Sequence, residues 1–85
     1  MKSATIRVLY FAQLRDSSGR DEELLPLRVA GVTTPADCFS ELALRYGFPL
    51  ARKVVRAAVN GRYTTWDHPL EDGDELAFIP PVAGG

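Results

Sequence analysis

An 85-residue chain has room for one domain with a modest hydrophobic core, because a chain of this size buries only about 60–65 % of the surface that it exposes when unfolded; a second domain is excluded. Apolar residues form 46 % of the sequence and charged residues 25 %, a composition that excludes an intrinsically disordered chain. Ten basic and eleven acidic residues leave a formal charge of −1, so nucleic acid and membrane surfaces are not expected as partners.

The first two strands are expected to form a hairpin around a short helix. Apolar side chains alternate along residues 5–12, with one set on each face: Ile6, Val8 and Tyr10, then Leu9 and Phe11. This period of two predicts a strand that is buried on both sides. Residues 13–18 predict a turn or two of helix ended by Gly19, and residues 22–29 predict the second strand. Pro26 cannot donate to a ladder, which places this strand near an edge or at a bulge.

The main helix has a start signal, an apolar stripe and a stop signal. Thr34 is the predicted N-cap, Pro35 suits the first helical position, and Asp37 is placed to complete a capping box. Apolar residues then recur at helical spacing: Phe39, Leu42, Ala43 and Tyr46. Gly47 and Pro49 end the pattern, so one face of the helix is expected to cover the sheet.

Three short strands are expected in the C-terminal half. Residues 55–59 and 62–65 flank an Asn-Gly pair that favours a tight hairpin turn, whereas residues 50–54 give no clear assignment. Residues 69–74 have turn composition, and residues 75–79 predict the last strand. Two prolines then end strand pairing.

The order strand, strand, helix, strand, strand, strand predicts an α+β fold of the ubiquitin-like β-grasp type. We expect a mixed sheet of about five strands, with the first and last strands side by side and one main helix packed on one face. The predicted domain spans residues 1–79, and residues 80–85 form a flexible, extended C-terminal tail.

The tail carries the expected chemistry. Pro80 and Pro81 favour an extended course, so six residues can reach about 20 Å into another protein. Gly84 and Gly85 lack side chains, which lets the chain pass a narrow channel and leaves the terminal carbonyl open to attack. A carboxylate must be activated before it can react as an acyl donor. Because the sequence has no phosphate-binding GxxxxGK[ST] loop, we expect a separate adenylating enzyme to use ATP, and no bound cofactor here.

The N-terminal residues and the cysteine content both bear on the cellular compartment. Residues 1–7 are too polar for a signal peptide, and no run of about 18 apolar residues is present to span a bilayer. The only cysteine, Cys38, has no partner for an intramolecular disulfide, which agrees with a reducing compartment. A cytoplasmic location is therefore expected. One cysteine and one histidine make a poor metal site.

Five segments together resemble the small subunit of molybdopterin synthase: residues 8–15 (VLYFAQLR), 57–60 (AAVN), 67–70 (DHPL), 72–75 (DGDE) and 78–85 (FIPPVAGG). The likeness spans nearly the whole chain, and the five segments in this order with a Pro-Pro-Val-x-Gly-Gly end are specific. The resemblance implies a non-catalytic sulfur carrier whose Gly85 carboxylate is adenylated by a ubiquitin-activating-type enzyme and converted to a thiocarboxylate. Sulfur would then pass to cyclic pyranopterin monophosphate during molybdenum cofactor biosynthesis.

The resemblance also implies how the carrier is held. Residues 80–85, with Pro80, Pro81, Val82, Ala83 and Gly84 leading to Gly85, would insert into the active site of the synthase large subunit. Two large subunits with one carrier at each end would form a heterotetramer.

A docking surface is expected on the sheet face that lacks a helix. If Ile6, Val8, Leu76 and Phe78 face the helix, strand alternation puts a second apolar set on the opposite face: Leu9, Phe11, Ala77 and Ile79. An exposed apolar patch of this kind marks a protein partner. The resemblance places hydrophobic docking residues at Phe11, Tyr63 and Ile79. The alternative is that residues 48–54 and 62–70 partly cover these side chains.

Several other residues are interpreted as structural. Cys38 lies beside the apolar stripe of the helix, and His68 stands in a turn without a second ligand nearby. Acidic residues at 67, 72, 74 and 75 flank strand turns, where they serve as caps, so no metal site is expected. Trp66 is assigned to the core or to docking. The basic residues Arg52, Lys53 and Arg56 are interpreted as a solvated face, with contact to an acidic partner such as the activating enzyme as the alternative.

Two other functions would use the same terminus. A ubiquitin-like modifier would join its Gly85 carboxylate to lysines of other proteins through an isopeptide bond. A thiamine-type sulfur carrier would deliver sulfur to a different product; residues 11–15 and the Pro80-Pro81 pair favour the molybdopterin branch instead.

Overall fold

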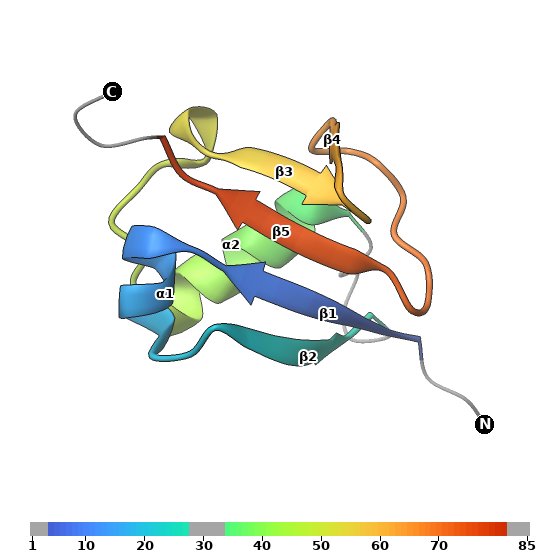
Figure 1. The fold of residues 1–85 in the computed structure, drawn as a ribbon, viewed down its shortest axis with the longest axis horizontal. Coiled ribbons are helices and arrows are strands. Elements are labelled where there is room, and N and C mark those ends of the chain that lie inside the picture. The colour runs from blue at the N-terminus through green and yellow to red at the C-terminus, as the bar shows by residue number, and fades with distance from the viewer. Residues whose placement is uncertain (1–3, 28–33, 82–85) are drawn as a thin grey trace.

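A five-stranded mixed sheet with one long helix behind it forms the body of the molecule (Figure 1). The computed structural model describes residues 4–27 and 34–81. The strands are β1 (Thr5–Tyr10), β2 (Glu22–Pro26), β3 (Arg56–Val59), β4 (Arg62–Thr64) and β5 (Glu75–Ile79), in the spatial order β2-β1-β5-β3-β4. The central pair, β1 and β5, is parallel, and the other neighbours are antiparallel. The predicted β-grasp fold, including the pairing of the first and last strands, is confirmed.

The first hairpin follows the predicted order but has shorter strands. β1 ends at Tyr10 instead of residue 12, because Ala12 takes a left-handed φ of 50° and α1 (Ala12–Ser18) begins there. Gly19 ends α1 with a φ of 75°, as expected. β2 ends at Pro26 on the outer edge of the sheet, which confirms the edge position. Leu27, also predicted for this strand, forms a bend after it, and the last two predicted residues, 28 and 29, lie outside the described residues.

The main helix, α2 (Pro35–Tyr46), begins and ends where its sequence signals predict. The Thr34 hydroxyl accepts a hydrogen bond from the amide of Asp37 at 3.2 Å, and Gly47 ends the helix with a φ of 67°. Phe39 and Leu42 are buried against the sheet, so the predicted apolar stripe is confirmed. Among the described residues, no helix is both long and apolar enough to cross a membrane.

The second hairpin is fixed by its turn and by an amide side chain. Asn60 and Gly61 have φ values of 53° and 83°, the left-handed pair that a two-residue hairpin turn requires. The Asn60 side chain donates to the Asp74 carboxylate at 2.9 Å and accepts from the Glu75 amide at 2.9 Å. This ties the β3–β4 hairpin to the start of β5. Residues 52–54, left unassigned from sequence, form the 3-10 helix η1 (Arg52–Val54).

Aromatic side chains fill the core between α2 and the sheet. Phe39 of α2 meets Phe78 of β5 edge to face, with ring centroids 5.2 Å apart. Trp66 is half-buried and stacks on Phe78 at 6.0 Å, which assigns Trp66 to the core. Tyr10 is buried at the end of β1, where its ring packs edge to face against Tyr46. The helix-facing side of the sheet is therefore fully occupied.

A polar cluster around Glu23 joins β2 to α2. The Glu23 carboxylate accepts hydrogen bonds from the hydroxyls of Tyr10 and Tyr46 at 2.8 and 2.5 Å. Arg45 and Arg20 approach the same carboxylate at 3.5 and 4.0 Å. With its side chain only 9 % exposed, Glu23 is a nearly buried charge with several partners, the condition under which such a charge is tolerated.

Candidate docking groove and C-terminal segment

An apolar hollow lies on the face of the sheet opposite α2, and we call it the sheet groove. Its volume is about 320 Å³, and its apolar lining residues are Leu9, Phe11, Ala58, Tyr63, Ala77 and Ile79. α2 crosses only the far face of the sheet in Figure 1, which leaves these side chains without a helical cover. The predicted second apolar face is thus present.

Small residues make the floor of the sheet groove. Ala58 of β3 and Ala77 of β5 are directly opposite each other in the antiparallel ladder. Side chains on one face of a strand pair point the same way, so two methyl groups stand where larger side chains would fill the space. Phe11 and Tyr63 rise beside this floor and are 45 and 59 % exposed. The hollow can therefore receive apolar side chains from a partner.

A second hollow continues the groove toward the C-terminal segment. It has a volume of about 280 Å³ and is lined by Val54, Arg56, Tyr63, Ile79, Pro80 and Pro81. Tyr63 and Ile79 line both hollows, so the apolar surface runs along β5 to the point where the described chain ends. Pro80 is buried and Pro81 is exposed. A partner seated in the sheet groove would lie beside Pro81.

The structure brings together the three residues predicted for docking. Phe11 and Ile79 share the sheet groove with Tyr63. Val54, within the loop considered as a partial cover, borders Tyr63 and Ile79, whereas Phe11 and Tyr63 remain about half exposed. The other predicted site residues, Val82, Ala83, Gly84 and Gly85, lie outside the described residues.

Sequence reasoning missed Val54 and Ala58 as parts of this surface. Val54 lies in η1 and is exposed, and Ala58 lies in β3 at the floor. The 3-10 turn has no clear sequence signal. The sequence alone does not place Ala58 in the groove, because its role depends on its register opposite Ala77, a contact between segments far apart in the chain.

Cys38 is a core thiol. It is completely buried on α2, and burial, followed by the nearby charges of Glu41 and Asp37, raises the pKa of the Cys38 thiol to about 12. A thiol nucleophile must be deprotonated and accessible, and Cys38 is neither at neutral pH. The structural interpretation of this residue is confirmed.

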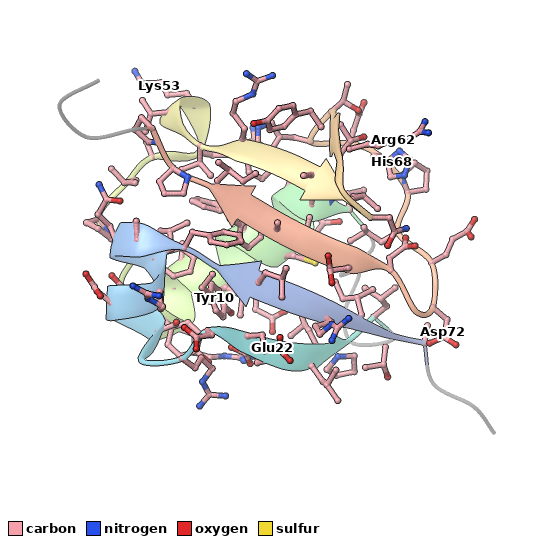
Figure 2. All side chains as sticks on the ribbon, viewed as in Figure 1. Tyr10, Glu22, Lys53, Arg62, His68 and Asp72 are labelled. Atoms are coloured by element: carbon pink, nitrogen blue, oxygen red, sulfur yellow. The ribbon has the colours of Figure 1, made fainter. Side chains whose placement is uncertain are left out.

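The acidic turn residues act as caps for backbone amides. Asp72 accepts from the amide of Thr5 at 2.8 Å, and Asp74 accepts from the amide of Glu71 at 2.8 Å. Within residues 4–27 and 34–81, no group of three or more His, Cys, Asp or Glu side chains is arranged to hold a metal ion. His68 is exposed and borders a separate polar hollow on the β3–β4 hairpin, beside Arg62 (Figure 2).

A family model and curated relatives both match this chain. The model of the ThiS family matches residues 8–85. The chain is 39 % identical over 80 residues to the molybdopterin synthase sulfur carrier subunit of Escherichia coli, an alignment that covers 94 % of this chain and 99 % of the relative.

Solved structures agree with this match. A putative molybdopterin converting factor subunit 1 from Pyrococcus furiosus is similar with a TM-score of 0.75 and 34 % identity, covering 94 % of this chain and 100 % of the other. A chain from the complex of subunits 1 and 2 of the molybdopterin-converting factor of Helicobacter pylori has a TM-score of 0.65 and 22 % identity, with coverages of 95 and 99 %. The latter likeness concerns the fold alone.

Proposed function

Because this chain belongs to the ThiS family and to its molybdopterin synthase sulfur carrier subunits, we propose that it carries sulfur to molybdopterin synthase. The structural observation that carries the proposal is the apolar surface along β5, which includes Pro80 and Pro81. A partner docked on that surface would receive the C-terminal residues directly. The role is that of a sulfur-donor subunit, with the catalytic groups supplied by the partner.

The proposed chemistry takes place at the Gly85 carboxylate. A separate adenylating enzyme transfers AMP from ATP to this carboxylate and releases pyrophosphate. A sulfur nucleophile then displaces AMP and leaves a thiocarboxylate. In the large subunit, sulfur passes to cyclic pyranopterin monophosphate while water restores the carboxylate, so the carrier returns to its starting state.

The domain's part in this cycle is recognition and delivery. Residues 82–85 would span about 14 Å beyond Pro81 if fully extended, enough to place Gly85 inside a neighbouring protein. The partners in this scheme are the synthase large subunit, in a heterotetramer, and the adenylating enzyme. Cys38 cannot relay sulfur, because it is enclosed by the core.

Intact-mass spectrometry tests the chemistry. The protein is incubated with host extract, ATP and a sulfur source, beside a variant that lacks Gly85. A mass gain equal to the replacement of one oxygen by sulfur, seen only in the full chain, is the expected result. An unchanged mass together with a ladder of larger conjugates would instead support the modifier function, and a gain in both proteins would place the sulfur elsewhere.

Binding to the synthase large subunit tests the docking surface. Tyr63→Ala removes an aromatic side chain shared by both hollows, and such interface residues contribute about 1–3 kcal/mol to binding. Leu44→Ala is the matched control, because Leu44 is 89 % exposed on α2, on the other side of the sheet. Titration calorimetry should show roughly 5- to 150-fold weaker binding for Tyr63→Ala and no change for Leu44→Ala. Equal affinities for the two variants would exclude the sheet groove as the docking surface.

A further inference from the structure

The cationic side chains divide into two sets by their partners. Lys2 and Arg28 lie outside the described residues, which leaves eight lysines and arginines. Four of these lie within 4.0 Å of a carboxylate: Arg7, Arg15, Arg20 and Arg45. The other four have no carboxylate within that distance in the described part of the chain: Arg52, Lys53, Arg56 and Arg62. The division follows the fold, since the unpaired set belongs to η1, β3 and β4.

Three of the unpaired cations lie near the C-terminal end of β5, and we call Arg52, Lys53 and Arg56 the basic rim. Val54, between them in η1, and Arg56 itself line the same hollow as Pro80 and Pro81. Figure 1 shows η1 beside the end of β5, and Figure 2 shows Lys53 at that end, whereas Arg62 lies toward the opposite end of the sheet. Positive charge is thus concentrated beside Pro80 and Pro81.

Aromatic rings hold two members of the basic rim in place. The Arg52 guanidinium lies 5.6 Å from the centroid of the Trp66 ring, and the Arg56 guanidinium lies 4.1 Å from that of Tyr63. A cation over a ring keeps its full charge, and its N–H groups stay available at the edges. Because Trp66 also stacks on Phe78 in the core, Arg52 is anchored to the rigid body of the domain. The rim is positioned without being neutralised.

We propose that the basic rim binds carboxylates around the entrance of the channel that accepts the C-terminal residues on the synthase large subunit. The inference rests on the proposed function and adds the charge of the partner's surface. A protein surface fits better than a polyanion, because the rim borders an apolar hollow and the chain as a whole carries a charge of −1. An apolar centre with charged residues at its edge is the usual composition of a protein interface.

Such a rim acts mainly on the rate of association. Charges at the edge of an interface steer the encounter and fix orientation, and salt screens them over about 8–10 Å at physiological ionic strength. For this chain, steering would bring the basic rim and the C-terminal residues to the channel before the partner's side chains enter the sheet groove. Association should therefore be faster at low salt, and its salt dependence should come from the basic rim.

A pair of charge reversals tests the proposal. Lys53→Glu reverses a rim charge, and Arg62→Glu reverses an equally unpaired charge toward the opposite end of the sheet from Lys53. Both residues are exposed and make no ion pair among the described residues, so neither change should affect folding. Stopped-flow association with the purified large subunit is measured for each at about 50 mM and about 500 mM NaCl. Lys53→Glu should associate roughly three- to tenfold more slowly than the unchanged protein at low salt, and Arg62→Glu should stay within about twofold.

The outcomes separate this inference from the proposed function. If the unchanged protein does not bind the large subunit at all, the proposed function fails and the inference fails with it. Normal binding with equal rates for both variants, or rates independent of salt, overturns the basic rim alone. Binding of a short RNA or of anionic vesicles that Lys53→Glu abolishes, with association to the large subunit unchanged, assigns the rim to a polyanion and also overturns the proposal.

Discussion

Removal of the two tyrosine hydroxyls that meet Glu23 should destabilise the domain by more than the sum of the single changes. In Tyr10→Phe the carboxylate still accepts from Tyr46 at 2.5 Å, and in Tyr46→Phe it still accepts from Tyr10 at 2.8 Å. In the double variant only the arginines remain, with Arg45 at 3.5 Å and Arg20 at 4.0 Å. A carboxylate that is 9 % exposed then lacks its closest donors.

The magnitude follows from the kind of bond that is lost. A hydrogen bond to a charged group contributes about 1.5–3 kcal/mol to stability, and each single variant should fall near the lower limit because one hydroxyl remains. The coupling free energy between the two sites should be at least about 0.5 kcal/mol, with the double variant less stable than additivity predicts. For a domain of this size each kilocalorie lowers the melting temperature by about 4–8 °C.

The assay is urea unfolding of all four members of the cycle, with Tyr63→Phe as the control. The Tyr63 hydroxyl makes no hydrogen bond within the described residues, so its loss should change the free energy of unfolding by less than about 0.5 kcal/mol. If Tyr10→Phe and Tyr46→Phe have effects as small as Tyr63→Phe, or if the two changes are simply additive, the two hydroxyls do not jointly stabilise the Glu23 carboxylate.

Three further results are expected from the structure. Leu42→Ala, at a fully buried position of α2, should lower the free energy of unfolding by about 2–5 kcal/mol in urea titrations, and a loss below about 1 kcal/mol would mean that the helix is not packed as described. Asn60→Ala should cost about 1–3 kcal/mol in the same assay, since it removes two hydrogen bonds from a left-handed position, whereas Arg62→Ala next to it should be nearly neutral.

Cys38 should resist a thiol reagent at pH 8 in the folded protein and react fully in urea; rapid reaction without urea would contradict its burial. Because burial raises the pKa of Cys38 from its ordinary value near 9 to about 12, the folded state binds the thiol proton more tightly than the unfolded state does. The contribution of the protonated Cys38 thiol to the free energy of unfolding is complete below pH 9 and declines as the pH rises toward 12. Cys38→Ala should remove this part of the loss of stability at alkaline pH.

Local signals explain which parts of the fold could be predicted from the sequence. The Thr34 cap, the Gly47 stop and the Asn60-Gly61 turn act through neighbouring residues, so their positions were predicted correctly. The sequence pattern extends β1 two residues beyond its actual end, because Ala12, which is not a glycine, adopts a φ of 50° that its residue type does not predict. The conformation of segments such as η1 depends on packing, so no local sequence signal predicts it.

The same distinction applies to the candidate site. Strand alternation was enough to put Leu9, Ala77 and Ile79 on the face without a helix, since a period of two needs only the sequence. The floor of the groove and the pairing of charges depend on contacts across the fold. Arg45 and Glu23, for example, are 22 residues apart in the chain and meet only when α2 packs over β2. No inspection of the sequence could show which cations remain without a carboxylate.

Core residues and candidate recognition residues lie on opposite faces of the sheet. The helix-facing set on β1 and β5, with Val8 and Phe78 as examples, is completely buried, whereas Phe11 and Tyr63 on the groove side are about half exposed. Stability therefore depends on one face of the sheet and recognition on the other. Substitutions at the sheet groove and at the basic rim can alter affinity for a partner while the fold remains intact, which is why binding and unfolding should respond to different variants of this chain.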